Sequence, residues 1–205
     1  PNIFCNSPWY ELHIFWNGDY GFCCQQPDRP YQNLKDNPYN VSKMSVKEWY
    51  NSEPMRDARM RMFLNDRWSN CQQCWKEEDT SSTSRRTRSN QKSVIFKEQF
   101  QDSVEQSPGY KHFSYSYENA GNYNGLPIDL HIDLGNYCNL ACKMCWSGAS
   151  STIASQEKQW GILTDDLHLG TDWTKDSNVW NKFLDDITAL PINNIHFMGG
   201  ETLIQ

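Results

Sequence analysis

Eight cysteines give this 205-residue chain most of its potential for chemistry, and they lie in tight groups at positions 5, 23, 24, 71, 74, 138, 142 and 145. An even number of cysteines in a secreted chain would predict disulfides. No secretory signal is present, so we expect a cytoplasmic protein. Grouped cysteines in a reducing compartment more often bind metal, which is our prediction, with buried metal-free thiols as the alternative.

The densest group is Cys138, Cys142 and Cys145, with the spacing C-x3-C-x2-C. Three thiolates on one loop can hold a four-iron cluster and leave one iron without a protein ligand. An open position of this kind is where a substrate or cofactor binds. Zinc is disfavoured because it prefers four ligands, and His131 is the nearest further candidate.

The sequence around this group predicts strands that alternate with helices. Apolar residues at 128, 130, 132 and 134 alternate with Asp129, His131 and Asp133, which predicts a strand with one apolar face. We expect these three polar side chains either to line a cavity or to form a hydrated surface. Helices are predicted at 151–160 and 178–189, and a second strand at 192–198. A strand, a crossover helix and a strand form a βαβ unit with parallel strands.

The eleven residues from Gly135 to Cys145 resemble the signature of the radical S-adenosylmethionine (radical SAM) superfamily. A second match, Gly199-Gly200-Glu201, follows the predicted second strand. Glycines permit close backbone approach, and a carboxylate accepts hydrogen bonds from an ammonium group. In this superfamily the two motifs meet at one end of a (β/α)6 partial TIM barrel.

The resemblance implies that Cys138, Cys142 and Cys145 hold a catalytic [4Fe–4S] cluster. It implies that Gly199, Gly200 and Glu201 contact the methionyl amino group of S-adenosylmethionine. Met144 stands just before the third cysteine, where many members have an aromatic residue near the adenine.

The activity implied is reductive cleavage of S-adenosylmethionine to a 5′-deoxyadenosyl radical that abstracts a substrate hydrogen. By family analogy the substrate is a peptide or protein, and the electron donor is a protein such as flavodoxin or ferredoxin. The alternative is a non-catalytic module with structural zinc or an electron-transferring iron–sulfur cluster, which needs closed four-ligand sites.

The earlier cysteines resemble the SPASM and twitch auxiliary domains of the same superfamily. Cys5, Gly18 and Cys23 fit the opening C-x(9–15)-G-x4-C, and the C-x2-C pair at 71 and 74 fits its continuation. No further cysteine follows this pair within the first region, as in the shorter twitch form. In most members this module follows the barrel, whereas here it precedes it.

The resemblance implies an auxiliary [4Fe–4S] cluster on Cys5, Cys23, Cys71 and Cys74. Cys24 is the alternative to Cys23. Zinc is the alternative metal, since four thiolates suit it well.

The chain divides into three expected regions. Residues 1–78 form a small α+β twitch/SPASM-like module, 79–126 a linker, and 127–205 the start of the barrel, truncated after its second strand. Because the chain begins without Met and stops soon after Gly-Gly-Glu, we expect an N-terminal fragment. Residues 80–88 are polar and basic and predict a solvated loop, and 107–125 predict an irregular connection.

Local signals define the first region. Asn17-Gly18 between the aromatic runs 9–15 and 20–23 predicts a β-hairpin. The Ser45-x-x-Glu48 spacing predicts a capping box. A helix beginning near residue 52 is predicted to bury its methionines.

Composition excludes several classes of protein. The aromatic fraction of 14% provides enough side chains for a packed core. A net charge of −6 disfavours nucleic-acid binding, including by the basic run 85–88. No apolar run approaches the roughly 20 residues that span a bilayer, so we expect no membrane partner.

Overall fold

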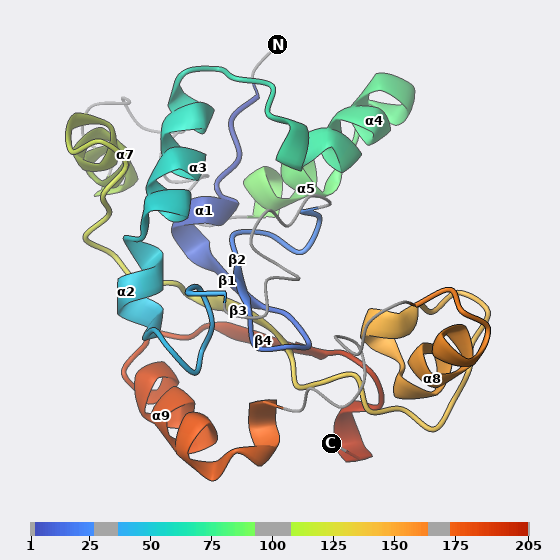
Figure 1. The fold of residues 1–205 in the computed structure, drawn as a ribbon. Helices are drawn as coiled ribbons and strands as arrows, with labels where there is room; N and C mark the ends of the chain where they lie inside the picture. Colours follow the sequence, from blue (N-terminus) through green and yellow to red (C-terminus); the bar gives the residue numbers. More distant parts are fainter. Residues whose placement is uncertain (1–2, 27–36, 93–107, 164–172, 205) are drawn as a thin grey trace.

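The computed structural model describes residues 3–26, 37–92, 108–163 and 173–204 (Figure 1). The fold is mixed α/β around a four-stranded sheet with the order β2-β1-β3-β4. The strands are β1 (Glu11–Ile14), β2 (Tyr20–Gly21), β3 (Asp129–Asp133) and β4 (Asn194–Met198). β1 pairs antiparallel with β2 and parallel with β3, and β3 pairs parallel with β4. One sheet therefore unites the first and last parts of the described chain.

Eight α-helices are described: α1 (Ser7–Tyr10), α2 (Val46–Tyr50), α3 (Glu53–Phe63), α4 (Gln72–Ser81), α5 (Arg85–Lys92), α7 (Pro108–Glu118), α8 (Ser151–Gln159) and α9 (Ser177–Thr188). Short 3-10 turns lie at 69–71, 147–149, 173–175 and 202–204. Helices α8 and α9 confirm the two helices predicted after the second cysteine group, and β3-α9-β4 is the predicted βαβ unit. The (β/α)6 barrel and the domain boundaries at 78 and 126 stay predictions.

The predicted hairpin is confirmed, with shorter strands than expected. Gly18 takes a positive φ of 82° in the turn between β1 and β2, a conformation that glycine adopts without strain. Trp9 and Tyr10, expected in the first strand, instead belong to helix α1. Pro8 lies in the first turn of that helix, where its fixed φ and missing N–H favour a helical start.

Both helices predicted in the first region are present. The capping box of α2 is formed, because Ser45 Oγ accepts from the Glu48 N–H and the Glu48 carboxylate accepts from the Ser45 N–H. Helix α3 buries Met55, Ala58 and Met62 on one face, as its spacing predicted.

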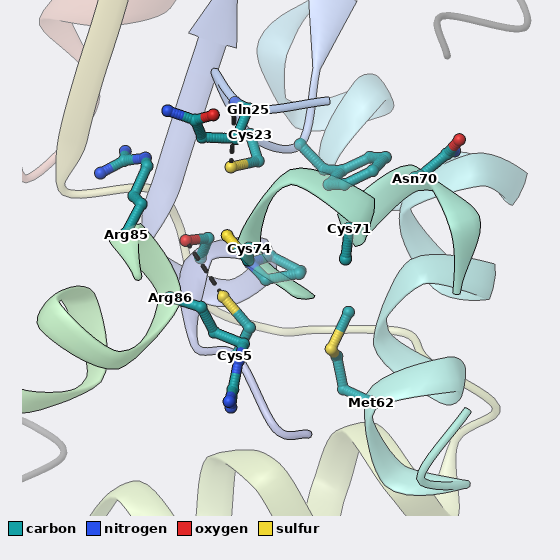
Figure 2. Close-up of a pocket in the computed structure, with 12 residues that line it drawn as sticks. Cys5, Cys23, Gln25, Met62, Asn70, Cys71, Cys74, Arg85 and Arg86 are labelled. Carbon is teal, nitrogen blue, oxygen red and sulfur yellow. Dashed lines mark hydrogen bonds between the residues drawn. The ribbon is translucent and has the colours of Figure 1, made fainter. Parts of the chain in front are cut away.

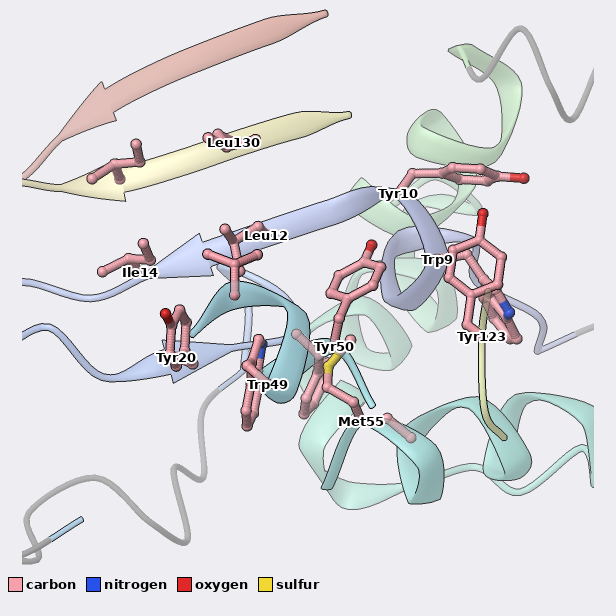
Figure 3. Packing of buried hydrophobic residues seen from close by; sticks show 14 of the residues in the cluster. Trp9, Tyr10, Leu12, Ile14, Tyr20, Trp49, Tyr50, Met55, Tyr123 and Leu130 are labelled. Atoms are coloured by element: carbon pink, nitrogen blue, oxygen red, sulfur yellow. The ribbon is translucent and has the colours of Figure 1, made fainter. Parts of the chain in front are cut away.

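The core lies on one face of the sheet (Figure 3). Alternate residues of two strands, Leu12, Ile14, Leu130 and Ile132, are at most 1% exposed. Trp49 of α2 and Phe183 of α9 belong to the same buried cluster. Each aliphatic side chain buried in this way contributes about 1.5–3 kcal/mol, so period-two patterning fixes which face turns inward.

Two expectations for the middle of the chain are wrong. Residues expected to form a solvated loop are in α5, where Arg86 is only 7% exposed. Its guanidinium bonds the Glu78 carboxylate at 2.9 Å and the Phe4 carbonyl oxygen at 2.7 Å, which compensates its burial. The segment expected to be an irregular connection contains α7, whose Phe113 ring packs edge-on against Trp9.

None of the helices in the described ranges combines the length and the apolar character needed to cross a membrane.

Candidate functional site

Four of the five early cysteines line a single pocket: Cys5, Cys23, Cys71 and Cys74. Cys5 precedes α1, Cys23 follows β2, and Cys71 and Cys74 stand at the start of α4. Figure 2 shows Cys5, Cys23 and Cys74 facing a common space. Three separate segments thus bring together the residues predicted as auxiliary ligands. Their role as ligands stays a prediction.

Burial controls the ionisation of these thiols. Desolvation is the main cause that raises the pKa of Cys5 to about 11 and of Cys71 to about 12, and the neighbouring Cys74 raises both further. At neutral pH these thiols are protonated, so a metal must displace protons to bind them. A cation in the pocket would also remove the mutual repulsion of the thiolates.

Two properties distinguish Cys23 from Cys24: the position of each thiol relative to the pocket, and its pKa. Cys23 lines the pocket, and the Gln25 N–H donates to its sulfur at 3.4 Å. Cys24 is not among the lining residues. A hydrogen bond with Cys23 lowers the pKa of Cys24 to about 7 and raises that of Cys23. Cys23 thus lies at the pocket and Cys24 does not, and the use of Cys23 as a ligand stays a prediction.

The four-thiol pocket is the candidate metal site of the N-terminal region. Among the described residues, no group of three or more His, Cys, Asp or Glu side chains is arranged to hold a metal ion. Zinc–sulfur bonds of about 2.3 Å at tetrahedral angles require sulfur atoms about 3.8 Å apart. A cluster of several irons separates its thiolates more widely than a single zinc ion does. The enclosed space is about 20 Å³, so the thiol-bearing segments must move outward to admit a cluster.

Two arginines of α5 also line this pocket, Arg85 and Arg86. Sequence reasoning missed both, since the run 85–88 was expected to be solvated. Arg85 Nη2 pairs with the Glu11 carboxylate at 2.7 Å. Burial raises the pKa of Glu11, and Arg85 opposes that rise. The pocket therefore places four thiols beside two arginines, each of which already pairs with a carboxylate.

The second group, Cys138, Cys142 and Cys145, lies on the loop after β3. Cys138 is buried, Cys145 is half-buried and Cys142 is exposed. Burial first, and then the neighbouring Cys142 and Cys138, raise the pKa of Cys145. As thiolates, Cys142 and Cys138 would thus each repel Cys145, a repulsion that a bound cation would relieve.

Hydroxyl groups at the start of α8 hold this loop, and sequence reasoning missed them. Ser151 Oγ accepts from the Cys138 N–H at 3.1 Å, and Thr152 Oγ1 donates to the Cys138 carbonyl oxygen at 2.7 Å. Ser150 Oγ donates to the Leu140 carbonyl oxygen at 2.8 Å and also caps α8. The run Ser150-Ser151-Thr152, at the start of the predicted helix, was the sequence signal for these hydroxyl contacts.

The Gly-Gly-Glu turn lies against the same loop. The N–H of Gly200 donates to the Gly135 carbonyl oxygen at 3.2 Å, and that of Glu201 donates to the Tyr137 carbonyl oxygen at 2.9 Å. Gly199 has a positive φ of 106°. A Cβ atom at Gly200 would overlap the Tyr137 carbonyl, so only glycine permits this approach. Met144 is 93% exposed on the cysteine loop.

The polar face of the sheet carries a row of histidines. His13, His131 and His196 occupy paired positions on three adjacent parallel strands. The ring centroids of His131 and His196 are 4.6 Å apart, and those of His131 and His13 are 6.0 Å apart. Desolvation, Arg85 and His196 lower the pKa of His131 to about 4, so its ring is neutral at pH 7. Within the described residues, His131 does not form a metal-binding group with the cysteine thiols.

A cavity, one of the two alternatives left open for the polar residues of β3, lies beside that strand. Asp129 and His131 line a space of about 580 Å³ between the polar sheet face and α5. Asp133, the third predicted residue, is not among the residues that line it.

Comparison with known proteins identifies one family. The model of the SPASM domain, described as an iron–sulfur cluster-binding domain, matches residues 5–75. No significant match to the chain was found among curated proteins or among solved structures. Residues 5–75 are therefore similar to an iron–sulfur cluster-binding domain of the SPASM type, as the spacing of the early cysteines predicted.

Proposed function

We propose that this chain carries the cluster and cofactor sites of a radical SAM enzyme, built at the start of a (β/α)6 partial barrel. One observation carries the proposal: the three-cysteine loop is hydrogen-bonded to the Gly-Gly-Glu turn. These two segments follow parallel, adjacent strands, β3 and β4. The carboxyl ends of parallel strands are where α/β enzymes bind their ligands.

Each residue of this site has a distinct role. Cys138, Cys142 and Cys145 would hold a [4Fe–4S] cluster through three of its irons. Such a cluster would supply the electron for reductive cleavage of S-adenosylmethionine, the chemistry from which hydrogen abstraction on a substrate would follow. The Glu201 carboxylate would accept hydrogen bonds from the methionyl ammonium group. Met144, exposed on the loop, would pack against the adenine.

A second cluster in the N-terminal pocket completes the proposal. Cys5, Cys23, Cys71 and Cys74 would hold it. An electron donor such as flavodoxin or ferredoxin and a peptide or protein substrate are the proposed partners. All eight cysteines are unbridged, as a reducing cytoplasm would keep them.

The alternative is a non-catalytic module with structural zinc or an electron-transferring cluster. The four-thiol pocket favours it, because four protein ligands close a metal site. That reading explains residues 5–75 but leaves the open three-cysteine loop and the adjoining Gly-Gly-Glu turn without a purpose.

The deciding experiment is anaerobic reconstitution, followed by iron and sulfide analysis and electron paramagnetic resonance with and without S-adenosylmethionine. Two four-iron clusters predict about eight irons per chain and a spectrum that the cofactor perturbs. Cys142→Ala should remove about four irons and the perturbation. Cys71→Ala should remove about four irons and keep the perturbation.

Cys24→Ser is the matched control, since Cys24 is a half-buried thiol outside both proposed ligand sets, and it should leave iron content and spectrum unchanged. Zinc in place of iron, or a spectrum blind to S-adenosylmethionine, would contradict catalysis and leave the non-catalytic module.

A further inference from the structure

The cavity on the polar face of the sheet has two walls of different character. One wall is the sheet, which contributes Glu11, Asp129, His131 and His196. The other wall is α5, whose Arg85, Arg88 and Ser89 share one face of the helix at helical spacing. At about 580 Å³ the cavity lies within the range of roughly 300–1,000 Å³ typical of small-molecule sites.

Four of the described side chains that line this cavity are those of Arg, Asp or Glu, and two of these four pair with each other. Arg85 pairs with the Glu11 carboxylate at 2.7 Å. Ser89 Oγ donates to the other oxygen of the same carboxylate at 3.2 Å. A ligand cannot use these groups without breaking a partly buried ion pair, which is costly.

The remaining charges are one cation and one anion that do not pair with each other. Within the described residues, the guanidinium of Arg88 has no hydrogen-bond or ion-pair partner, and it is exposed at the cavity wall. Asp129 accepts one hydrogen bond, from the Asn194 side chain at 2.8 Å, and has no cationic partner in the same part of the structure.

The rest of the described lining is mostly polar and contains no further Lys, Arg, Asp or Glu. It includes four carboxamides, those of Asn6, Gln25, Asn193 and Asn194. A carboxamide can both donate and accept hydrogen bonds. His131 is neutral at pH 7, because burial lowers its pKa. The cavity therefore offers Arg88 as a positive contact and Asp129 as a negative contact among hydrogen-bonding side chains.

We propose that this cavity binds a small zwitterion, with the ligand's carboxylate on Arg88 and its ammonium group on Asp129. A ligand with both charges satisfies both side chains, whereas a singly charged ligand leaves one of them uncompensated. The cavity shares Gln25 and Arg85 with the four-thiol pocket, so the ligand would lie beside that pocket. This inference goes beyond the radical SAM proposal and does not rest on it, because it involves neither iron nor S-adenosylmethionine.

The test is calorimetric titration of the full chain at low ionic strength with three zwitterions of increasing charge separation: glycine, γ-aminobutyrate and ε-aminocaproate. Singly charged n-butyrate and n-butylamine are the matched ligands. At least one zwitterion should bind about tenfold more tightly than either singly charged ligand, the effect of one charge-assisted hydrogen bond. Binding should weaken as salt is added.

Variants assign the binding to the cavity. Arg88→Gln and Asp129→Asn should each weaken the best zwitterion about fivefold or more. Arg67→Gln and Asp57→Asn are matched controls, since both residues are exposed, form surface ion pairs and lie outside the cavity. They should leave affinity unchanged. A thermal melt of each variant verifies that it is folded.

Glu201→Gln separates this site from the proposed cofactor site, because it removes the carboxylate assigned to the methionyl ammonium group. Affinity unchanged by Glu201→Gln and reduced by Asp129→Asn assigns the zwitterion to the cavity. The proposal is overturned if no zwitterion binds, if n-butyrate binds as tightly, or if the folded cavity variants bind as the wild type does. Iron content and spectra test the radical SAM proposal separately.

Discussion

The backbone N–H of Glu201 donates to the carbonyl oxygen of Tyr137 at 2.9 Å. This bond joins the turn after β4 to the residue immediately before Cys138. Two segments more than sixty residues apart in sequence thus form one unit. Any change that separates them should disturb both the cluster site and the cofactor site.

Gly200→Ala is the sharpest change of this kind, because its Cβ would overlap the Tyr137 carbonyl. We expect it to lower the free energy of unfolding by about 1–3 kcal/mol, as overpacking does. We also expect reconstituted protein to lose iron from the three-cysteine loop and its spectral response to S-adenosylmethionine. Iron analysis and electron paramagnetic resonance measure both losses.

Gly161→Ala is the control for this prediction. Gly161 has a positive φ of 72° and open space around its Cα, so alanine there adds only backbone strain of about 1–2 kcal/mol. Its iron content should equal that of the wild type. Normal iron content and a normal spectrum in Gly200→Ala would show that the two segments are not tightly joined.

Stability should depend on pH through His131. Desolvation first, with Arg85 and His196, lowers its pKa to about 4, below the value of about 6.5 in an unfolded chain. Between these values the unfolded chain binds more protons, so stability falls as pH drops from about 6.5 toward about 4. Above about pH 6.5 the His131 ring is neutral in both the folded and the unfolded chain, so this loss of stability is absent. Imidazole NMR, assigned with His131→Asn, measures this pKa, and a titration midpoint near 6.5 would refute the prediction.

Local structure was predictable wherever the signal was local. The capping box at Ser45, the turn at Gly18 and the apolar face of α3 all follow from residues within one or two turns of each other. The four early cysteines that the spacing grouped do line one pocket, and their role as ligands stays a prediction. Short-range hydrogen bonds and periodic burial decide such features, so distant contacts seldom overturn them.

The burial of α5 was not predictable, because it depends on partners far away in sequence. Residues 85–88 are three arginines and one threonine, a composition that predicts a solvated segment. The structure instead places Glu78 and the Phe4 carbonyl oxygen beside Arg86. Ion pairing then makes the burial of the guanidinium acceptable. This one helix contributes Arg85 to the lining of both pockets.

The histidine row had a signal that was overlooked. His13, His131 and His196 each lie between two apolar residues, in the triplets Leu-His-Ile, Leu-His-Ile and Ile-His-Phe. Turning the apolar residues of neighbouring strands toward one face places the histidines together on the other. The alignment of the three histidines depends on strand order and register, which no single segment encodes.

Arg59 should be among the most important residues for stability. Its side chain is fully buried and donates to the carbonyl oxygens of Pro8 and Gly121, both at 3.0 Å. Arg59→Ala leaves both buried oxygens without these donors, so we expect a loss of about 3 kcal/mol in urea denaturation. Arg56→Ala, on the same helix and only partly buried, should change stability by less than about 0.5 kcal/mol. Equal effects of the two variants would contradict this role.

The hydroxyl of Thr152 should hold the three-cysteine loop in its binding shape. Thr152→Val keeps the shape of the side chain and removes the 2.7 Å hydrogen bond to the Cys138 carbonyl oxygen. We expect a stability loss of about 1 kcal/mol and faster loss of iron from this loop to a chelator. Ser155→Ala on the same helix removes a 2.9 Å bond to the Ser151 carbonyl oxygen, one that does not touch the loop. Iron release at the same rate in both variants would mean that the start of α8 does not position Cys138.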